Sequence, residues 1–150
     1  MKTVQSWKAE KVKKEETRAA RRLVSVSGLP RGGLDDAQLW CVKGEEGRII
    51  GVAGLETWGR QGLLRSVAVD KGHLKEGVGT SLVRQIIAEA RKKKMSELFL
   101  ITETAPLFFE RLGFSGIDRA RVRGAVLGSV EFNEACSETA PVMRMELRSR

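Results

Sequence analysis

The chain has 150 residues, of which 41% are hydrophobic and 31% are charged. This composition is ordinary for a globular protein, and the length suits one domain with a sizeable core, so we expect a single domain over residues 1–150. The 27 basic and 19 acidic side chains give a net charge of +8, which fits either nucleic acid or a small polyanionic ligand.

Several classes of protein are excluded by what the sequence lacks. Cys41 and Cys136 are far apart and His73 is the only histidine, so no Cys/His spacing for a metal is present and we expect no metal. Residues 1–22 lack the apolar core of a signal peptide, and no apolar run approaches the length of a membrane span. We therefore expect a cytoplasmic protein that binds no membrane.

The hydrophobic pattern predicts a mixed α/β fold. The N-terminal half contains a short strand, a helix followed by Gly28 as its C-cap, and three strands joined by glycine-containing turns. These elements are expected at residues 3–7, 15–26, 38–43, 48–57 and 63–69. The C-terminal half contains an amphipathic helix, a strand, a helix, a possible third helix and a closing strand. These are expected from residue 78 through the basic run 91–94, and at 97–101, 106–112, 121–136 and 142–147.

A glycine-bearing turn links the strand at 63–69 to the amphipathic helix. Such a turn can direct several backbone N–H groups at one anion, and the positive end of the helix dipole lies at the same point. It is not a Walker A loop, because Val78 and Gly79 stand where Lys and Ser/Thr are required. It is not a dinucleotide fingerprint either, because Leu82 occupies the third glycine position. A tight strand-to-helix turn with no ligand remains the alternative.

Two segments resemble the GNAT superfamily of acyl-coenzyme A N-acyltransferases. The first is Leu74-Lys75-Glu76-Gly77-Val78-Gly79 followed by Thr80, and the second runs from Ala105 to Phe114. Segments at 54–56, 64–67, 118–119, 131–132 and 140–147 further resemble the small acetyltransferases associated with arsenic-resistance gene clusters. The resemblance covers about residues 20–148. It implies a twisted sheet with an antiparallel N-terminal meander and splayed central strands, flanked by helices, whereas residues 1–20 match poorly and are expected to be mobile.

The resemblance also implies how acetyl-coenzyme A (acetyl-CoA) is held. Backbone groups of Val67, Ala68 and Val69 would bind the pantetheine, and an N–H at Val67 would polarise the thioester carbonyl. The pyrophosphate would lie on Leu74, Lys75, Glu76, Gly77, Val78, Gly79 and Thr80. Leu74 stands where the family has a basic or amide side chain, so the pyrophosphate would have to be bound by backbone N–H groups.

The proton donor to the departing thiolate is missing, because the chain has no tyrosine and Phe109 stands where the family often has one. Either the protein only binds acyl-CoA, or no dedicated acid is needed. A thiol with a pKa near 8.5 leaves acceptably as thiolate at neutral pH, which favours the second reading. Ser66, Thr102 and Thr104 are possible replacement donors.

Four residues are candidates for the acceptor side. Glu56, near the end of the strand next to the cofactor strand, is the candidate general base, although it could hold an ammonium group or lie at the surface. Arg65 is unusual in an apolar strand, and it could bind a substrate carboxylate or pair with a glutamate. Trp58 and Thr102 are candidates to line the acceptor pocket.

Together these features predict an N-acetyltransferase. It would move acetyl from acetyl-CoA to a primary amine of a small, amino-acid-like acceptor by direct attack in a ternary complex. The arsenic-resistance resemblance adds an arsenical as a possible acceptor. A non-catalytic acyl-CoA sensor is the main alternative, and a small basic nucleic-acid binder is a remote one. We expect no nucleic-acid partner, and a homodimer is possible.

Overall fold

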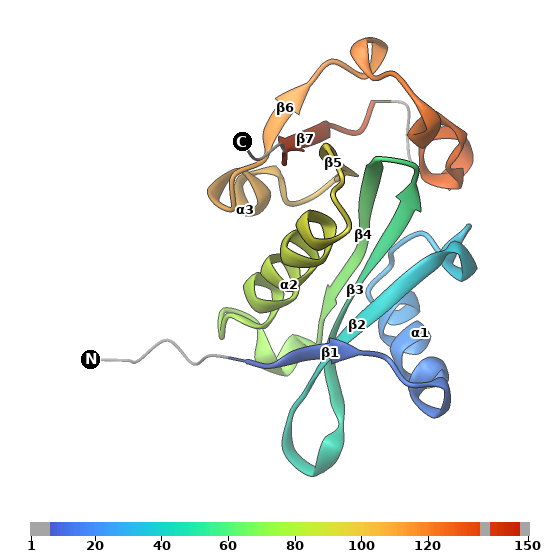
Figure 1. Cartoon of the computed structure of the whole chain (residues 1–150). Coiled ribbons are helices and arrows are strands. Elements are labelled where there is room, and N and C mark those ends of the chain that lie inside the picture. The colour runs from blue at the N-terminus through green and yellow to red at the C-terminus, as the bar shows by residue number, and fades with distance from the viewer. Residues whose placement is uncertain (1–6, 136–138, 148–150) are drawn as a thin grey trace.

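The computed structural model describes residues 7–135 and 139–147 and shows a mixed seven-stranded sheet flanked by helices (Figure 1). The predicted fold class is therefore confirmed. The sheet order is β1-β2-β3-β4-β5-β7-β6. The strands are β1 (Ala9–Lys11), β2 (Ala37–Lys43), β3 (Ile49–Trp58), β4 (Gln61–Val69), β5 (Glu97–Ile101), β6 (Ser115–Ile117) and β7 (Val142–Glu146). The α-helices are α1 (Thr17–Val26), α2 (Val78–Lys92) and α3 (Pro106–Arg111).

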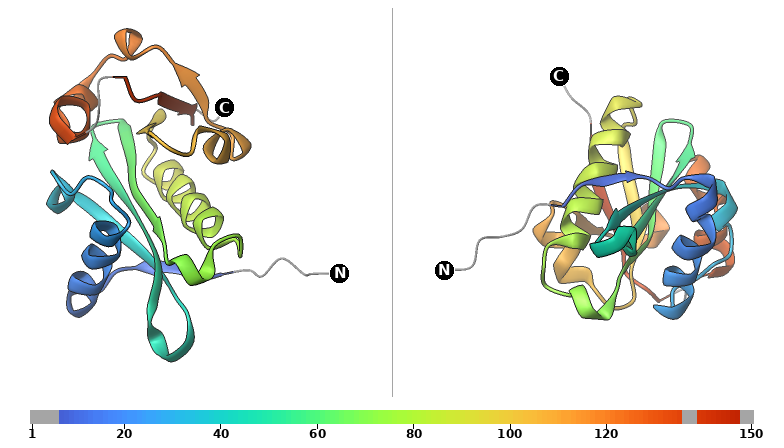
Figure 2. Two further views of the ribbon diagram at one scale, coloured as in Figure 1. Left: turned by 180° about the vertical axis from the view of Figure 1, so that it is seen from behind. Right: turned by 90° about the horizontal axis from the view of Figure 1, so that it is seen from below.

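The helices cover both faces of the sheet, with α1 on one face and α2 on the other (Figure 2). Side chains of a strand alternate between its two faces, so β2 supplies both cores. Trp40 and Val42 pack on the α2 side, whereas Leu39 and Cys41 pack on the α1 side. None of the helices in the described part of the chain is long and apolar enough to cross a membrane.

The two central strands separate after a short parallel contact, as the splayed arrangement predicted. β4 pairs with β5 only from Gln61 to Leu63. On its other edge, β4 has a bulge, because Val52 pairs with Ala68 while Gly54 pairs with Arg65, which leaves two β4 residues opposite one residue of β3. Ser66, in this bulge, has a positive φ of 59°. The bulge and the separation open a gap along β4 beyond Leu63.

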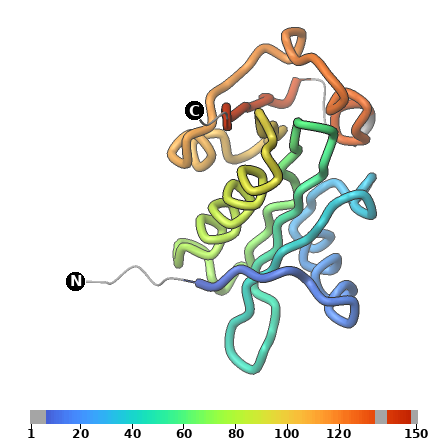
Figure 3. Tube along the Cα trace, viewed as in Figure 1, coloured from blue at the N-terminus to red at the C-terminus, as the bar shows by residue number. Residues whose placement is uncertain are grey.

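The predicted helix at 121–136 is wrong. Figure 3 follows this segment from β6 around one end of the sheet as a chain of short turns. They are two 3-10 helices, at Arg119–Arg121 and Ala125–Gly128, and a short π-helix at Glu131–Ala135. Gly124 breaks the helix, because its φ of 104° is not helical. The valine spacing still predicts which side chains are buried, since Val122 and Val126 both pack in a core cluster against β4 and β5.

Two further elements also differ from the prediction, namely the first strand and a short strand in the C-terminal half. Of the strand expected at 3–7, residues 3–6 lie outside the described residues, and the first described strand is β1 at Ala9–Lys11. The short strand β6 was not predicted, because its residues are exposed or half-buried and carry no apolar alternation. The remaining predicted strands and helices agree with the structure to within a few residues.

Gly51 on β3 allows α2 to pack closely, and replacing it with alanine is expected to destabilise the protein. A Cβ atom at Gly51 would overlap Val78 and would lie 2.9 Å from Leu82 Cδ1. Overpacking of this kind costs about 1–3 kcal/mol, so urea unfolding of Gly51→Ala should show that loss. Gly116→Ala on β6 is the control, because a Cβ there meets nothing within 4 Å. Equal unfolding midpoints for the two variants would contradict the packing argument.

Candidate functional site

A cavity of about 1070 Å³ lies along the gap between β4 and β5. Its walls are the side of β4 from Leu64 to Val69, the turn at 73–80, the end of β5 and the start of α3, and the loop after α1. Glu131 closes the wall next to Arg65 and Ser66. Cavities of this size commonly hold small-molecule ligands.

The turn at 74–80 forms one end of the cavity, and all seven residues line it. Gly77 precedes α2 in the left-handed conformation (φ 89°), as does Lys75 (φ 65°). The first-turn N–H groups of a helix have no intrahelical partner, and no side chain of the described residues caps α2. A Cβ at Gly79 would lie 3.3 Å from Phe108 Cζ and 3.5 Å from Val69 Cγ2, so a side chain there would occupy the cavity. These features fit a bound phosphate group.

The N-terminal segment supports this turn from outside. Trp7 Nε1 donates a hydrogen bond of 2.9 Å to the carbonyl of Glu76, and the edge of its ring meets His73. His73 Nδ1 lies 3.0 Å from Glu76 Oε1. His73 is half-buried and lines the cavity. Leu74 and Lys75 are exposed.

The predicted cofactor strand runs along the middle of the cavity. Val67 and Val69 line it, whereas Ala68 is 3% exposed and packs in the core on the α1 side. A contact from Ala68 to a ligand would therefore be made by its backbone. Beyond Leu63, β4 has no partner strand on its β5 side among the described residues, so backbone groups on that edge are available to a ligand.

The start of α3 supplies the aromatic wall. Phe109 is buried and lines the cavity, and its ring packs edge to face with Phe108 and Phe114 at 5.0 and 6.0 Å. It offers no hydroxyl group. Thr102 also lines the cavity, and its Oγ1 accepts a hydrogen bond of 3.0 Å from Ala105 N–H at the start of α3. The Thr102 hydroxyl can still donate, because only its acceptor side is used.

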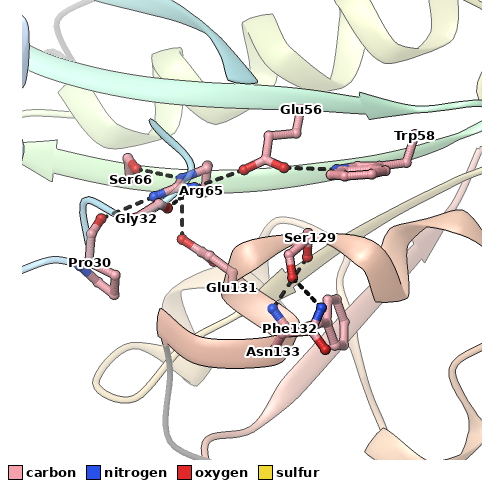
Figure 4. Close-up of polar contacts among 10 residues, drawn as sticks. All are labelled: Pro30, Gly32, Glu56, Trp58, Arg65, Ser66, Ser129, Glu131, Phe132 and Asn133. Atoms are coloured by element: carbon pink, nitrogen blue, oxygen red, sulfur yellow. Dashed lines mark hydrogen bonds and ion pairs between the residues drawn. The ribbon is translucent and has the colours of Figure 1, made fainter. Parts of the chain in front are cut away.

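A buried ionic network surrounds Arg65, whose side chain has no exposed surface (Figure 4). Nη1 donates to Glu56 Oε2 at 2.8 Å and to the carbonyl of Gly32 at 2.7 Å. Nη2 donates to the carbonyl of Pro30 at 3.1 Å. Nε donates to Ser66 Oγ at 3.0 Å and lies 3.3 Å from Glu131 Oε2. One N–H of Nη2 has no partner among the described residues.

Glu56 is fully engaged within the sheet. It is 1% exposed, which excludes the surface position considered for it, and its second oxygen accepts a hydrogen bond of 2.8 Å from Trp58 Nε1. Neither Glu56 nor Trp58 lines the cavity. The expected pocket position of Trp58 is therefore wrong, and Glu56 is placed to orient Arg65. Of the two readings of Arg65, the pairing with a glutamate is confirmed, and it occurs in the interior.

Glu131 is the acidic side chain that the sequence did not single out as a site residue. It is 3% exposed and lines the cavity. Its turn is held by Ser129, whose hydroxyl accepts a hydrogen bond of 3.3 Å from Phe132 N–H and whose carbonyl accepts one of 2.9 Å from Asn133 Nδ2. Burial raises the pKa of Glu131 to about 7; Arg65 lowers that pKa and Glu56 raises it further. The sequence signal that could have identified Glu131 as a buried site residue is an acidic residue between two apolar ones, Val130 and Phe132.

Cys41 is not among the residues that line this cavity. Its side chain is buried in β2, and burial raises the pKa of its thiol. Cys136 lies outside the described residues. Within residues 7–135 and 139–147, no group of three His, Cys, Asp or Glu side chains is arranged to hold a metal ion.

Comparison with known proteins identifies related sequences. The family model for the acetyltransferase (GNAT) domain matches residues 35–116. Among curated proteins, an amino-acid acetyltransferase from Mycobacterium tuberculosis (strain ATCC 25618 / H37Rv) is 33% identical over 92 residues. That match covers 60% of this chain and 49% of the relative, so it spans about half of the relative's length.

Solved structures share the fold. Rv2747 from Mycobacterium tuberculosis, in complex with CoA, has a TM-score of 0.79 at 21% identity, covering 94% of this chain and 99% of that one. N-acetylglutamate synthase from Neisseria gonorrhoeae, complexed with coenzyme A and N-acetyl-glutamate, has a TM-score of 0.79 at 16% identity. This second match covers 98% of this chain and 36% of the synthase.

Proposed function

We propose that this chain, which belongs to the acetyltransferase (GNAT) family, is an acetyl-CoA-dependent N-acetyltransferase that acetylates the primary amine of a small, amino-acid-like acceptor. The amine would attack directly while both substrates are bound. The observation that carries the proposal is that Glu131, which pairs with the fully buried Arg65, lines the same cavity as the turn at 74–80. One cavity therefore offers a phosphate site and a charged acceptor site.

The cofactor end of the cavity suits CoA. Acetyl-CoA supplies the acetyl group as a thioester. The first-turn N–H groups at Val78, Gly79 and Thr80 would receive the pyrophosphate, with Lys75 adding positive charge and Leu74, Glu76 and Gly77 shaping the turn. The free edge of β4 at Val67–Val69 would hold the pantetheine by backbone hydrogen bonds, and Phe109 would pack against it.

The acceptor end suits a molecule that carries an ammonium and a carboxylate. Glu131 presents a carboxylate to the cavity, and Arg65 retains one N–H of Nη2. With Glu56 included, the ionised network carries one positive and two negative charges, so it attracts an ammonium. The amino-acid acetyltransferase among the relatives supports the same class of acceptor.

No tyrosine is available to protonate the departing thiolate. We propose that the thiolate leaves without a dedicated acid, because a thiol with a pKa near 8.5 is a tolerable leaving group at neutral pH. Ser66, Thr102 and Thr104 all line the cavity and could donate a hydrogen bond to the sulfur.

The test combines binding and turnover. Isothermal titration of the full chain with acetyl-CoA should give saturable binding. Thiol release should then be measured over a panel of the common amino acids, simple alkylamines and an arsenic-containing amino acid. We expect turnover with one or more amino acids and slower turnover with alkylamines, because alkylamines lack the carboxylate that Arg65 would bind.

The alternatives predict different results. Binding of acetyl-CoA without turnover on any amine would favour the acyl-CoA sensor. Failure to bind acetyl-CoA, together with affinity for DNA or RNA that falls steeply with salt, would favour the nucleic-acid binder. The arsenic-resistance resemblance and the homodimer stay predictions; the arsenical in the panel tests the first, and sedimentation tests the second.

A further inference from the structure

We propose that Glu131, rather than Glu56, is the general base that accepts the proton of the acceptor's ammonium group. This inference rests on the proposed function, because it concerns how the acceptor amine becomes a nucleophile. It assigns a catalytic role to a residue outside the sheet, in the turn segment between β6 and β7.

The first argument is position. Side chains normally alternate along a strand, yet Leu64, Arg65, Ser66 and Val67 all line the cavity, because the bulge at Ser66 turns the strand. Glu131 contacts this stretch through Arg65 Nε. The strand from Arg65 to Val69 spans about 13 Å and then leads into the turn at 74–80. Glu131 therefore lies on the cavity wall away from the phosphate site, where an acceptor would enter beside the cofactor strand.

The second argument is that the other carboxylates are unsuitable. Glu56 has one oxygen on Arg65 and the other on Trp58, and it does not line the cavity. Glu76 and Glu103 do line the cavity, but Glu76 is partly exposed and contacts His73 in the turn, and Glu103 is exposed. Among the cavity-lining residues that the structure describes, Glu131 is thus the buried carboxylate.

The third argument is its electrostatic setting. Glu131 is faced by Arg65 and Ser66 on β4 and, across Arg65, by Glu56 on β3. Arg65 Nε lies 3.3 Å from Glu131 Oε2, but its N–H donates its hydrogen bond to Ser66 Oγ. Burial and the Glu56 charge keep the pKa of Glu131 near 7, which suits a base at neutral pH. A stronger interaction with Arg65 would have lowered the pKa of Glu131 further and made Glu131 a weak base.

The proposed step conserves atoms and charge. Glu131 takes one proton from the ammonium, and the free nitrogen lone pair attacks the thioester carbonyl carbon. The C–N bond forms, the C–S bond breaks, and the thiolate departs with the electron pair of that bond. The nitrogen loses its second proton to the sulfur, which gives the amide and the free thiol. Glu131 then releases its proton to water, so each turnover liberates one proton.

The test is the pH dependence of kcat/KM for Glu131→Gln, with the amino acid that wild type turns over fastest. Wild-type kcat/KM should rise with pH and level off above about 7 as Glu131 loses its proton. Glu131→Gln should lower kcat/KM at pH 8 by about 100-fold or more and should lack that rise. Its affinity for acetyl-CoA should change less than twofold, because the phosphate site lies elsewhere. Glu131→Ala should regain activity when formate is added as an external base.

Two further variants separate catalysis from structure. Glu56→Gln removes the other carboxylate on Arg65, and it should keep a pH-dependent rise, shifted to lower pH because the Glu56 charge raises the pKa of Glu131, even if its activity falls. A Glu131→Gln variant that keeps the wild-type rate and pH profile overturns the inference, as does a Glu131→Ala variant that formate does not rescue. If wild type releases no thiol with any amine, the proposed function fails, and this inference fails with it.

Discussion

Replacing Arg65 with methionine is expected to lower the free energy of unfolding by about 3–5 kcal/mol at pH 8. Arg65 is the cation between Glu56 and Glu131, and all three side chains are buried. Without the guanidinium, two negative charges remain in the interior, and the carbonyls of Pro30 and Gly32 lose their donor. Urea unfolding followed by circular dichroism would measure the loss.

The destabilisation by Arg65→Met should also depend on pH. Protonation neutralises a buried carboxylate, so the folded variant gains stability relative to wild type as the pH falls from 8 towards 5. Arg48→Met is the matched control, because Arg48 pairs with Asp70 but is 72% exposed, and loss of such a pair costs about 1 kcal/mol or less. Similar losses for both variants would mean that the buried network does not stabilise the fold.

Replacing Gly79 with aspartate is expected to weaken acetyl-CoA binding by about 100-fold or more, which corresponds to about 2.7 kcal/mol. The new carboxylate would project into the cavity near Phe108 and Val69 and would repel the pyrophosphate at the start of α2. An acidic residue in the first turn of a helix is favoured by the helix dipole, so the variant should fold. Isothermal titration with acetyl-CoA measures the effect.

Ser81→Asp is the matched control for this substitution. It places the same charge in the first turn of α2, but Ser81 does not line the cavity. Its affinity for acetyl-CoA should therefore stay within a few-fold of wild type. If Gly79→Asp bound acetyl-CoA as tightly as Ser81→Asp, the phosphate would lie somewhere other than the turn at 74–80.

Much of the fold could be predicted because its central elements are marked locally. The apolar stripe of α2 and the glycines before it specify a strand, a turn and a helix, whatever the rest of the chain does. The segment at 121–136 could not be predicted in the same way. Its valines are spaced as in a helix, but Gly124 and the contacts of Gln61 with Arg123 and Val126 hold it in turns.

The sequence by itself indicated the family, the use of acetyl-CoA and the proposed position of the phosphate site. These depend on backbone conformation and on glycines at neighbouring positions, which are local properties of the chain. Only the tertiary structure decided which acidic side chains line the cavity. Glu56 and Glu131 are 75 residues apart in the sequence, and the fold brings both to Arg65, whereas only Glu131 of the two lines the cavity. Burial and charge pairing of this kind arise from contacts between distant segments of the chain.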